Sequence, residues 1–374
     1  MPVLAVLFTV FQINIMKILV ITDIPSPYKI TFLEMLSKYH EIYVYFQDRK
    51  SDDRDDKWYK STSGINARFL NQNKLRRFVD LLTLDISDYD IFWNLKYVAW
   101  ESMLMAVKFR LKHKLNLMHA DGGIYHDFGV LLNFGMRRAM ALNHYFTSSG
   151  ILTDEYYLKN GVSKDKIFHY HFSSVCQKDI EFAPIKKSND SNTVFNLLSV
   201  GQPIHRKGFD VLLKAIADIT NIKLTIVGGE PNQECSELLN SLNLKNKVNF
   251  VPFVPFEQLK EYYLNSDLFV FPTREDIWGL VLNEAMIFGL PIISTTNCGA
   301  AVEFAYQYKN CICVDVDNSE MLKNQILEVL TNDQLRLEMA ANSRKFANEV
   351  VIDRMVYDYN EIFEDLESKI KSCS

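Results

Sequence analysis

Two acidic residues, Asp276 and Glu284, and two basic residues, Arg206 and Lys207, are candidates for a ligand-binding or catalytic site in this sequence of 374 residues. Asp276 and Glu284 stand eight positions apart, with Glu275 next to the first of them. A polar turn and one helical turn would separate Asp276 from Glu284, so both carboxylates could face one crevice and accept hydrogen bonds from neighbouring hydroxyl groups. Arg206 and Lys207 could neutralise a diphosphate leaving group. Together the four side chains indicate a site for a phosphorylated, hydroxyl-rich ligand.

Each of these features also has a purely structural interpretation. Arg206 and Lys207 by themselves are typical of a surface pair beside a helix cap, and their functional interpretation depends on their lying near Asp276. A charged loop and an exposed helix acid would explain Asp276 and Glu284. This explanation is weaker for Glu284, because its helical neighbours are apolar: Leu282, Ala285, Met286 and Ile287.

The segments around these residues place them at the edge of a parallel sheet. A short apolar run, Asp267–Phe271, ends at a proline and predicts a buried strand. After Gly279, the residues Leu280, Glu284 and Ile287 recur at helical spacing. Ligands of open α/β sheets bind at the carboxyl ends of the strands, where a helix start offers N–H groups to phosphate.

Short apolar strands alternate with helical stretches along the chain, which favours doubly wound parallel sheets. The strands expected in the first half are Lys17–Thr22, Glu41–Phe46, Tyr89–Leu95, Leu115–Ala120, His144–Ser149 and Ile167–Phe172. Those expected in the second half are Phe195–Val200, Lys223–Val227, Val248–Val251, Leu268–Phe271, Pro291–Thr295 and Ile312–Val316. A polar stretch at 173–192 marks a boundary. We therefore expect an α/β protein with domains at 16–180 and 193–350 facing across a cleft, and a helix at 351–374 that crosses back to the first domain.

Composition and charge limit the class of protein. A hydrophobic fraction of 48% and a charged fraction of 23% are ordinary for a globular enzyme and exclude disordered and collagen-like chains. Residues 1–180 carry a net charge of +4 and the remainder −9. A basic first half would suit an anionic membrane surface, although a solvated face is the commoner meaning. Nucleic acid is not expected as a partner, because no basic run is interleaved with aromatic residues.

Cysteine spacing and the N-terminal residues bear on location. The six cysteines form no CxxC pair and have no histidines at zinc spacing, which predicts reduced thiols in the cytoplasm.

Residues 1–15 are apolar but too short to span a bilayer. They either precede a native start at Met16 or form a weak signal or membrane-contacting segment.

An ordered set of motifs in the second half resembles the nucleotide-sugar-binding domain of the GT-B, family 4 retaining glycosyltransferases, also called glycosyl transferases group 1. The matching segments are Gly201 with Arg206-Lys207-Gly208, Val227-Gly228-Gly229, Val248-Asn249-Phe250 with Tyr262-Tyr263, Asp276 to Glu284-Ala285-Met286, and Gly289-Leu290-Pro291. The family usually has Glu where Asp276 stands, and often has Arg where Gln202 stands.

The resemblance implies a donor site and roles within it. Glu284 would hold the ribose hydroxyls, Asp276 a sugar hydroxyl, and Arg206 with Lys207 the departing nucleotide. The donor-binding residues it implies are Gly201, Gln202, Arg206, Lys207, Phe253, Val254, Asp276, Gly279, Leu280, Val281 and Glu284. Among them, the N–H groups of Leu280 and Val281 would bind the diphosphate, and the backbone at Phe253-Val254 would contact the base. The family needs no metal or other cofactor. The Asp-x-Asp triplets at 53–55, 88–90 and 315–317 could suggest a metal-dependent transferase, but this pattern is common in loops and at strand ends, so we discount them.

In the first half the resemblance is thinner. It implies an acceptor side formed by Pro27, Tyr28, His119 and Asp121, with His119 as a fourth catalytic residue beside Arg206, Lys207 and Asp276. His119 follows a predicted strand and would contact the transferred sugar. The alternative for His119 is a satisfied histidine at the sheet edge.

The function implied is transfer, with retention, of a sugar from a UDP- or GDP-sugar to a hydroxyl of a growing cell-surface glycan of the capsule, exopolysaccharide or lipopolysaccharide type, carried on a lipid. Aromatic and basic residues of the first half would then contact the inner face of the membrane: Trp93, Tyr97, Trp100, Phe109-Arg110 and Arg137-Arg138. Two alternatives stay open, a nucleotide-sugar epimerase of the same fold and a non-catalytic relative that binds a glycan or a partner transferase. Gln202 keeps the second alternative open.

Overall fold

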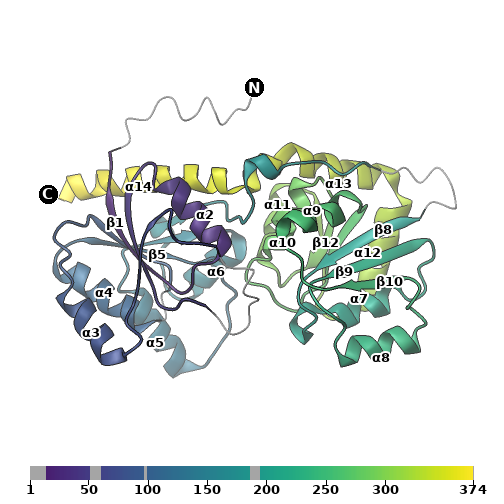
Figure 1. The fold of residues 1–374 in the computed structure, drawn as a ribbon, viewed down its shortest axis with the longest axis horizontal. Helices are drawn as coiled ribbons and strands as arrows, with labels where there is room; N and C mark the ends of the chain where they lie inside the picture. The colour runs from purple at the N-terminus through teal and green to yellow at the C-terminus, as the bar shows by residue number, and fades with distance from the viewer. Residues whose placement is uncertain (1–13, 51–59, 97–98, 186–193, 374) are drawn as a thin grey trace.

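A computed structural model describes residues 14–50, 60–96, 99–185 and 194–373, which form two α/β domains side by side (Figure 1). Each domain is built on one parallel sheet, with strand orders β3-β2-β1-β4-β5-β6-β7 and β10-β9-β8-β11-β12-β13. In both sheets the strand order reverses beside the first strand, so the predicted doubly wound architecture is confirmed.

The strands agree with the sequence prediction except at their ends and at one edge. The first sheet contains β1 (Lys17–Thr22), β2 (Glu41–Phe46), β3 (Asn66–Phe69), β4 (Ile91–Asn94), β5 (Leu115–His119), β6 (Tyr145–Ser148) and β7 (Ile167–His169). The second contains β8 (Phe195–Val200), β9 (Ile222–Val227), β10 (Val248–Val251), β11 (Leu268–Phe271), β12 (Ile292–Thr295) and β13 (Cys311–Val314). The prediction missed β3, because this edge strand has no apolar run and alternates exposed with half-buried residues. It also made the strand at Ile167 three residues too long.

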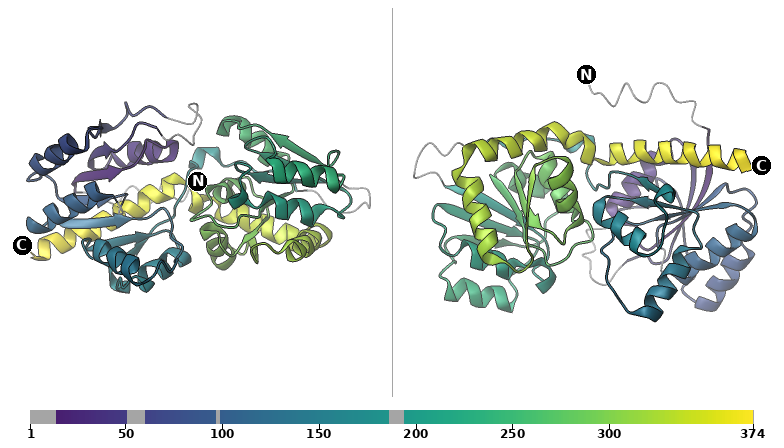
Figure 2. Two further views of the ribbon diagram at one scale, coloured as in Figure 1. Left: turned by 90° about the horizontal axis from the view of Figure 1, so that it is seen from below. Right: turned by 180° about the vertical axis from the view of Figure 1, so that it is seen from behind.

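Helices cover both faces of each sheet (Figure 2). Those of the first domain are α2 (Pro27–Leu36), α3 (Lys74–Thr83), α4 (Trp100–Leu111), α5 (Val130–Met140) and α6 (Ile151–Lys159). Those that follow are α7 (Phe209–Ile216), α8 (Gln233–Ser241), α9 (Phe256–Leu264), α10 (Leu280–Ile287), α11 (Gly299–Gln307), α12 (Ser319–Thr331), α13 (Asp333–Phe346) and α14 (Ile352–Cys373). In the part of the chain that the structure describes, none of the helices combines the length and the apolar character that crossing a bilayer requires.

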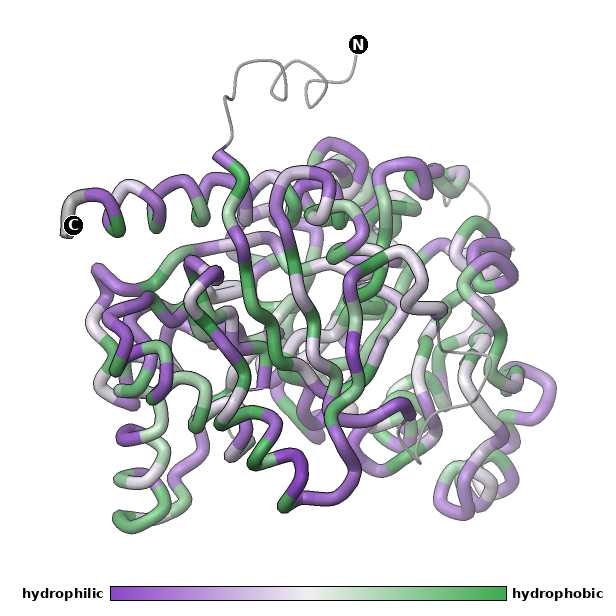
Figure 3. The backbone as a smooth tube through the Cα atoms, turned by 60° about the vertical axis from the view of Figure 1, so that its left-hand side comes forward, coloured by the Kyte–Doolittle hydropathy of each residue, from purple (hydrophilic) through white to green (hydrophobic). Residues whose placement is uncertain are grey.

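The long last helix, α14, runs from the second domain back over the first. Its residues alternate between hydrophilic and hydrophobic along the helix, as one buried face requires (Figure 3). Tyr359 and Phe363 on that face pack against Trp93 of β4, with ring centroids 4.6 and 5.5 Å apart. Phe32 of α2 joins the same cluster, 5.8 Å from Trp93. The last helix is therefore part of the core of the first domain.

Two residues expected at a membrane surface lie in this core instead. The side chains of Trp93 and Phe109 are completely buried, because β4 is a central strand and Phe109 lies on the inner side of α4 against Phe92, 5.5 Å away. The prediction that they contact a membrane is wrong. Trp100, Arg137 and Arg138 are exposed, whereas Tyr97, residues 1–13 and the triplet at 53–55 lie outside the described residues.

We expect Phe363→Ala to lower the free energy of unfolding by about 3–5 kcal/mol, because removing a fully buried ring leaves a cavity between α14 and the first sheet. Urea unfolding followed by circular dichroism measures this change. Asp365→Ala on the exposed side of the same helix is the control and should change stability by less than about 0.5 kcal/mol. Equal stability of the two variants would contradict the packing described for α14.

Candidate functional site

Two loops of the second domain touch backbone to backbone at the carboxyl edge of its sheet. One follows β8 and the other follows β11, and these strands are neighbours. The Arg274 N–H donates to the Arg206 carbonyl at 2.8 Å, and the Thr273 hydroxyl donates to the same oxygen at 3.0 Å. Gly208, with φ of 68°, makes this approach possible, because a Cβ there would lie 2.0 Å from the Pro272 carbonyl oxygen.

The contact brings together the cations and the first carboxylate predicted from the sequence. Lys207 Nζ lies 2.6 Å from Asp276 Oδ2, and both side chains are about one-seventh exposed. Arg206 is half-exposed; its Nη1 lies 3.3 Å from the same oxygen and donates to the Glu275 carbonyl at 2.7 Å. Lys207 therefore has a fixed position, whereas Arg206 can reach toward solvent.

A third cation, Arg274, stabilises the two loops and was not singled out from the sequence. Its guanidinium binds both carboxylate oxygens of Asp210 at 2.8 Å, donates to the His205 carbonyl at 2.6 Å and lies 2.7 Å from Asp317. Burial works to raise the pKa of Asp210, but its hydrogen bonds and ion pair with Arg274 hold that pKa below its usual value. Arg274 thus joins the loop after β8 to the loop after β11.

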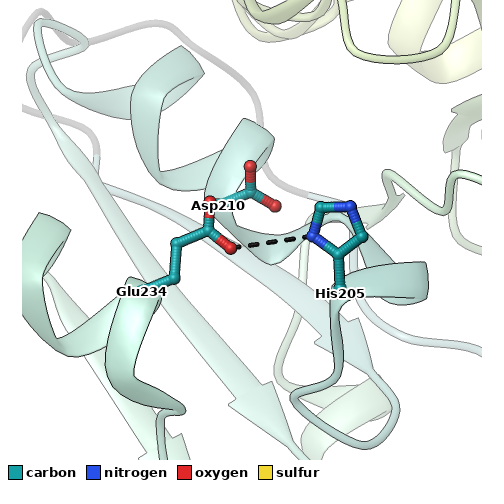
Figure 4. Close-up of side chains that lie close together, drawn as sticks. All are labelled: His205, Asp210 and Glu234. Carbon is teal, nitrogen blue, oxygen red and sulfur yellow. Dashed lines mark ion pairs between the residues drawn. The ribbon is translucent and has the colours of Figure 1, made fainter.

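Arg274 also occupies one of the residues of a possible metal site. Among the described residues, His205, Asp210 and Glu234 place potential ligand atoms within 4.8 Å of one another (Figure 4). His205 Nδ1 lies 3.8 Å from Glu234. Both oxygens of Asp210 already bind Arg274, and Lys214 lies 3.5 Å from one of them. A cation placed here would face these two positive groups, so the cluster is a poor metal site.

Helix α10 begins beside Asp276. Its first residue follows Gly279, which has φ of 94° and sits over Cys298, whose sulfur would lie 2.7 Å from a Cβ at that position. The first N–H groups of a helix, here those of Leu280 and Val281, have no partner within the helix and carry partial positive charge. Leu280 follows Asp276 by four residues, and Asp276 pairs with Lys207. This corner of the domain can therefore bind an anion.

Glu284 lies one turn inside α10 and is half-buried. Its carboxylate accepts a hydrogen bond of 2.8 Å from the Tyr263 hydroxyl. Burial raises the pKa of Glu284 to about 7, and the hydrogen bond from Tyr263 opposes the rise. Glu284 can therefore change its charge near neutral pH, which the sequence alone did not indicate.

The other predicted donor-binding residues lie at the ends of adjacent strands on the same edge. Gly201 and Gln202 follow β8, and the Gly201 N–H donates to the Val227 carbonyl at 2.8 Å. Phe253 and Val254 follow β10, and the Phe253 side chain is 44% exposed. The strand order β10-β9-β8-β11 therefore gives one continuous row of loops from Phe253 to Asp276.

In the first domain the structure gathers three of the predicted acceptor residues into one hydrogen-bonded group. Tyr28 donates to Asp121 at 2.9 Å, and His119 Nε2 lies 2.8 Å from the other oxygen of Asp121. His119 Nδ1 lies 2.5 Å from the hydroxyl of Tyr359 on α14. Pro27 adjoins Tyr28 as the first residue of α2.

His119 itself is 2% exposed, and both of its ring nitrogens have partners inside the domain. Burial works to raise the pKa of Asp121, but the charge of Lys29 and hydrogen bonds from His119 and Tyr28 hold it well below its usual value. An ionised carboxylate only accepts, so His119 Nε2 carries the proton and donates to Asp121. Asp121, with 27% of its side chain exposed, reaches the surface, as does the half-buried Tyr28. Contact of His119 with a sugar stays a prediction.

A few contacts close the gap between the domains. His126 lies 3.1 Å from Glu275, and the Ile151 N–H donates to Glu303 at 3.0 Å. Gly122 lies so close to Ile277 that a Cβ on it would be 2.2 Å from that residue's carbonyl oxygen. Asp121 and Asp276 therefore lie on facing loops, as two sides of one site require.

Comparisons with known proteins show what the chain resembles. Residues 181–346 match the family model for glycosyl transferases group 1. An uncharacterized glycosyltransferase of Methanocaldococcus jannaschii is 27% identical over 179 residues, or 48% of this chain and 50% of that protein. The capsular polysaccharide biosynthesis glycosyltransferase CapM of Staphylococcus aureus is 22% identical over 321 residues, 82% of this chain and 75% of CapM.

Among solved structures, Anabaena HepE in complex with UDP has a TM-score of 0.75 at 17% identity, covering 94% of this chain and 100% of HepE. At that identity the likeness concerns the fold. The chain spans about half the length of the Methanocaldococcus relative. The two facing doubly wound domains and the matched segment lead to one conclusion: the protein has the GT-B fold, and its residues 181–346 are similar to the glycosyl transferases group 1 family.

Proposed function

We propose that the protein is a retaining glycosyltransferase that moves a sugar from a UDP- or GDP-sugar to a hydroxyl of a growing cell-surface glycan. The observation that carries the proposal is the Lys207–Asp276 pair at 2.6 Å, next in the chain to the start of α10 and within the matched family segment. HepE, which shares the fold, has been solved with UDP and with UDP-glucose, and this supports a nucleotide-sugar donor.

The proposed chemistry divides among the residues of the row of loops. The diphosphate lies against the N–H groups of Leu280 and Val281, and Lys207 with Arg206 stabilises the negative charge that develops as the sugar–phosphate bond breaks. Asp276 holds a hydroxyl of the sugar, and Glu284 holds those of the ribose.

Retention follows if the acceptor hydroxyl attacks from the side on which the phosphate leaves. The departing phosphate oxygen then takes the proton of that hydroxyl, so no separate base is needed. Asp121, hydrogen-bonded to Tyr28, precedes Gly122, which lies against Ile277 of the second domain, and the two side chains would orient the acceptor or the sugar. With two cations at the diphosphate, we propose that the reaction needs no metal ion.

The proposed acceptor is a lipid-linked glycan of the capsule, exopolysaccharide or lipopolysaccharide type, met at the cytoplasmic face of a membrane. Similarity to CapM over 82% of the chain supports the capsule type. The net charge of +4 in residues 1–180 supports contact with an anionic surface.

One assay separates this function from its alternatives. The protein is incubated with a panel of UDP- and GDP-sugars, with and without a lipid-linked acceptor, and with EDTA. Acceptor-dependent release of nucleotide that EDTA does not reduce supports transfer. Conversion to a second nucleotide sugar without release would indicate an epimerase. Neither release nor donor binding in calorimetry would contradict the enzyme function.

We expect Lys207→Met to lower kcat/KM by about 100–1,000-fold, since the variant keeps the length of the side chain but removes the charge that stabilises the leaving diphosphate. Steady-state nucleotide release measures the effect. Lys223→Ala, which removes an exposed lysine from β9 of the same domain, is the control and should leave the rate unchanged. A loss of less than tenfold would contradict the role given to Lys207.

Glu284→Gln should weaken donor binding by about 10–100-fold, because hydrogen bonds from the ribose to a charged oxygen are replaced by weaker ones to an amide. Titration calorimetry with the donor measures the dissociation constant. The control is Glu275→Gln, which changes the acid next to Asp276. Glu275 pairs with His126 across the cleft, and its substitution should leave donor affinity unchanged. Equal effects of the two substitutions would show that the wrong acid has been assigned to the ribose.

Donor binding should also depend on pH through Glu284. Its pKa of about 7 means that the carboxyl is mostly protonated at pH 6 and mostly ionised at pH 8. Since the ionised form accepts the ribose hydroxyls, affinity for the nucleotide sugar should fall about tenfold from pH 8 to pH 6. Calorimetry across this range tests the expectation, and Glu284→Gln should flatten the profile. A profile of the variant that matches the wild type would contradict this source of the pH dependence.

A further inference from the structure

Helix α3 lies on the first domain with its apolar side outward. Its exposed apolar residues recur at the spacing of one helix face: Leu75, Phe78, Val79 and Leu82. Leu75 is the most exposed of the four, at 73%. The inner side of the helix carries Arg77 and Leu81. A helix that covers a sheet normally buries its apolar stripe, so packing among the described residues does not explain the stripe on α3.

A buried ion pair fixes this orientation. Arg77 Nη1 lies 2.6 Å from Glu101 of α4, and both side chains are at most 10% exposed. Arg77 Nε also donates to the Asn71 carbonyl at 2.7 Å, and Gln47 donates to Glu101 at 3.0 Å. Turning α3 to bury its stripe would break this pair and leave Glu101 buried without a counter-ion, which is strongly unfavourable.

Exposed apolar residues also occur on α4, which packs against α3, and at the start of α5. On α4 the exposed residues are Trp100, Met103, Val107 and Leu111, and at the start of α5 they are Phe128, Val130, Leu131, Leu132 and Phe134. The ring of Phe78 lies 6.3 Å from that of Trp100, which joins the stripes of α3 and α4. The three helices lie on the side of the first domain opposite α14 (Figures 1 and 2). We call these exposed residues of α3, α4 and the start of α5 the outer apolar face.

Positive charge predominates on the three helices that carry the outer apolar face. The cations of the three helices besides Arg77 are Lys74, Arg76, Lys108, Arg110, Arg137 and Arg138. Their acids are Asp80 and Glu101, and Glu101 is neutralised by Arg77. An apolar surface with an excess of cations is complementary to a bilayer that has apolar chains beneath anionic headgroups.

We propose that the outer apolar face docks the protein on an anionic lipid bilayer. Its aliphatic and aromatic side chains would enter the boundary between headgroups and acyl chains, and the lysines and arginines would contact the headgroups. The proposal extends the proposed function, because it names the surface by which the protein would meet a lipid-linked acceptor. Binding to lipid does not itself require transfer to occur.

Co-sedimentation of the full chain with vesicles tests the proposal. We expect binding to phosphatidylcholine vesicles that contain phosphatidylglycerol, and much weaker binding to phosphatidylcholine alone. Phe78→Ser with Leu82→Ser should reduce partitioning at least tenfold, because both side chains lose their apolar burial. Lys74→Glu and Arg76→Glu should each reduce binding to anionic vesicles by about fivefold or more.

The matched control is Tyr306→Ser, which removes a 64% exposed aromatic side chain from α11 of the second domain and should not change partitioning. Circular dichroism checks that each variant is folded, which is expected because every altered side chain is exposed.

Either of two results would overturn the proposal: absence of vesicle binding, or binding that Phe78→Ser with Leu82→Ser does not reduce. Self-association seen by light scattering, lost in that variant and unaccompanied by lipid binding, would make the face a protein interface and would overturn it too. Vesicle binding is measured without donor, and nucleotide release with a water-soluble acceptor is measured without lipid. Failure of the docking surface is thus distinguishable from failure of the proposed function.

Discussion

The backbone contact between the loops after β8 and β11 is the constraint on which the donor side depends. These strands are neighbours in the sheet, so their loops start side by side, and the Arg274 N–H reaches the Arg206 carbonyl at 2.8 Å. The missing side chain of Gly208 lets the Pro272 carbonyl lie where a Cβ would otherwise stand. Lys207 can therefore reach Asp276 at 2.6 Å, although 69 residues separate the two in the chain. Any larger residue at 208 would separate the charges as well as the loops.

Electrostatic pairing within these loops decides which charges a ligand can use. Arg274 is held by Asp210 and Asp317, so its charge is already balanced by carboxylates. Lys207 and Arg206 share one carboxylate, Asp276, and an arriving anion would find an excess of positive charge there. Asp276 in turn keeps Lys207 in place before the ligand arrives, so little reorganisation is needed at that moment.

Periodicity and turn residues were sufficient to predict the architecture, because buried parallel strands are continuous apolar runs. They failed at β3, an edge strand whose residues are half solvated. The pairing of Lys207 with Asp276 could be anticipated, since both follow strands of one sheet. The Tyr359 hydroxyl beside His119 could not, because 240 residues separate them and only the path of α14 brings them together. The outward stripe of α3 was equally hidden, since helical spacing predicts an apolar face but not its direction.

The contacts between the domains differ in strength from the cleft to the linker. At the cleft, His126 and Glu275 are both more than a third exposed, and such a pair contributes little to stability. At the linker, the Ser173 hydroxyl donates to the Val350 carbonyl at 2.6 Å, and the N–H of Ile352, the first residue of α14, donates to the Val175 carbonyl at 2.7 Å. Opening would therefore break contacts at the cleft and pivot near the linker. Because Glu275 adjoins Asp276, this weak pair across the cleft lies next to the donor site, so the contact that opens most easily is at the place where a ligand would enter.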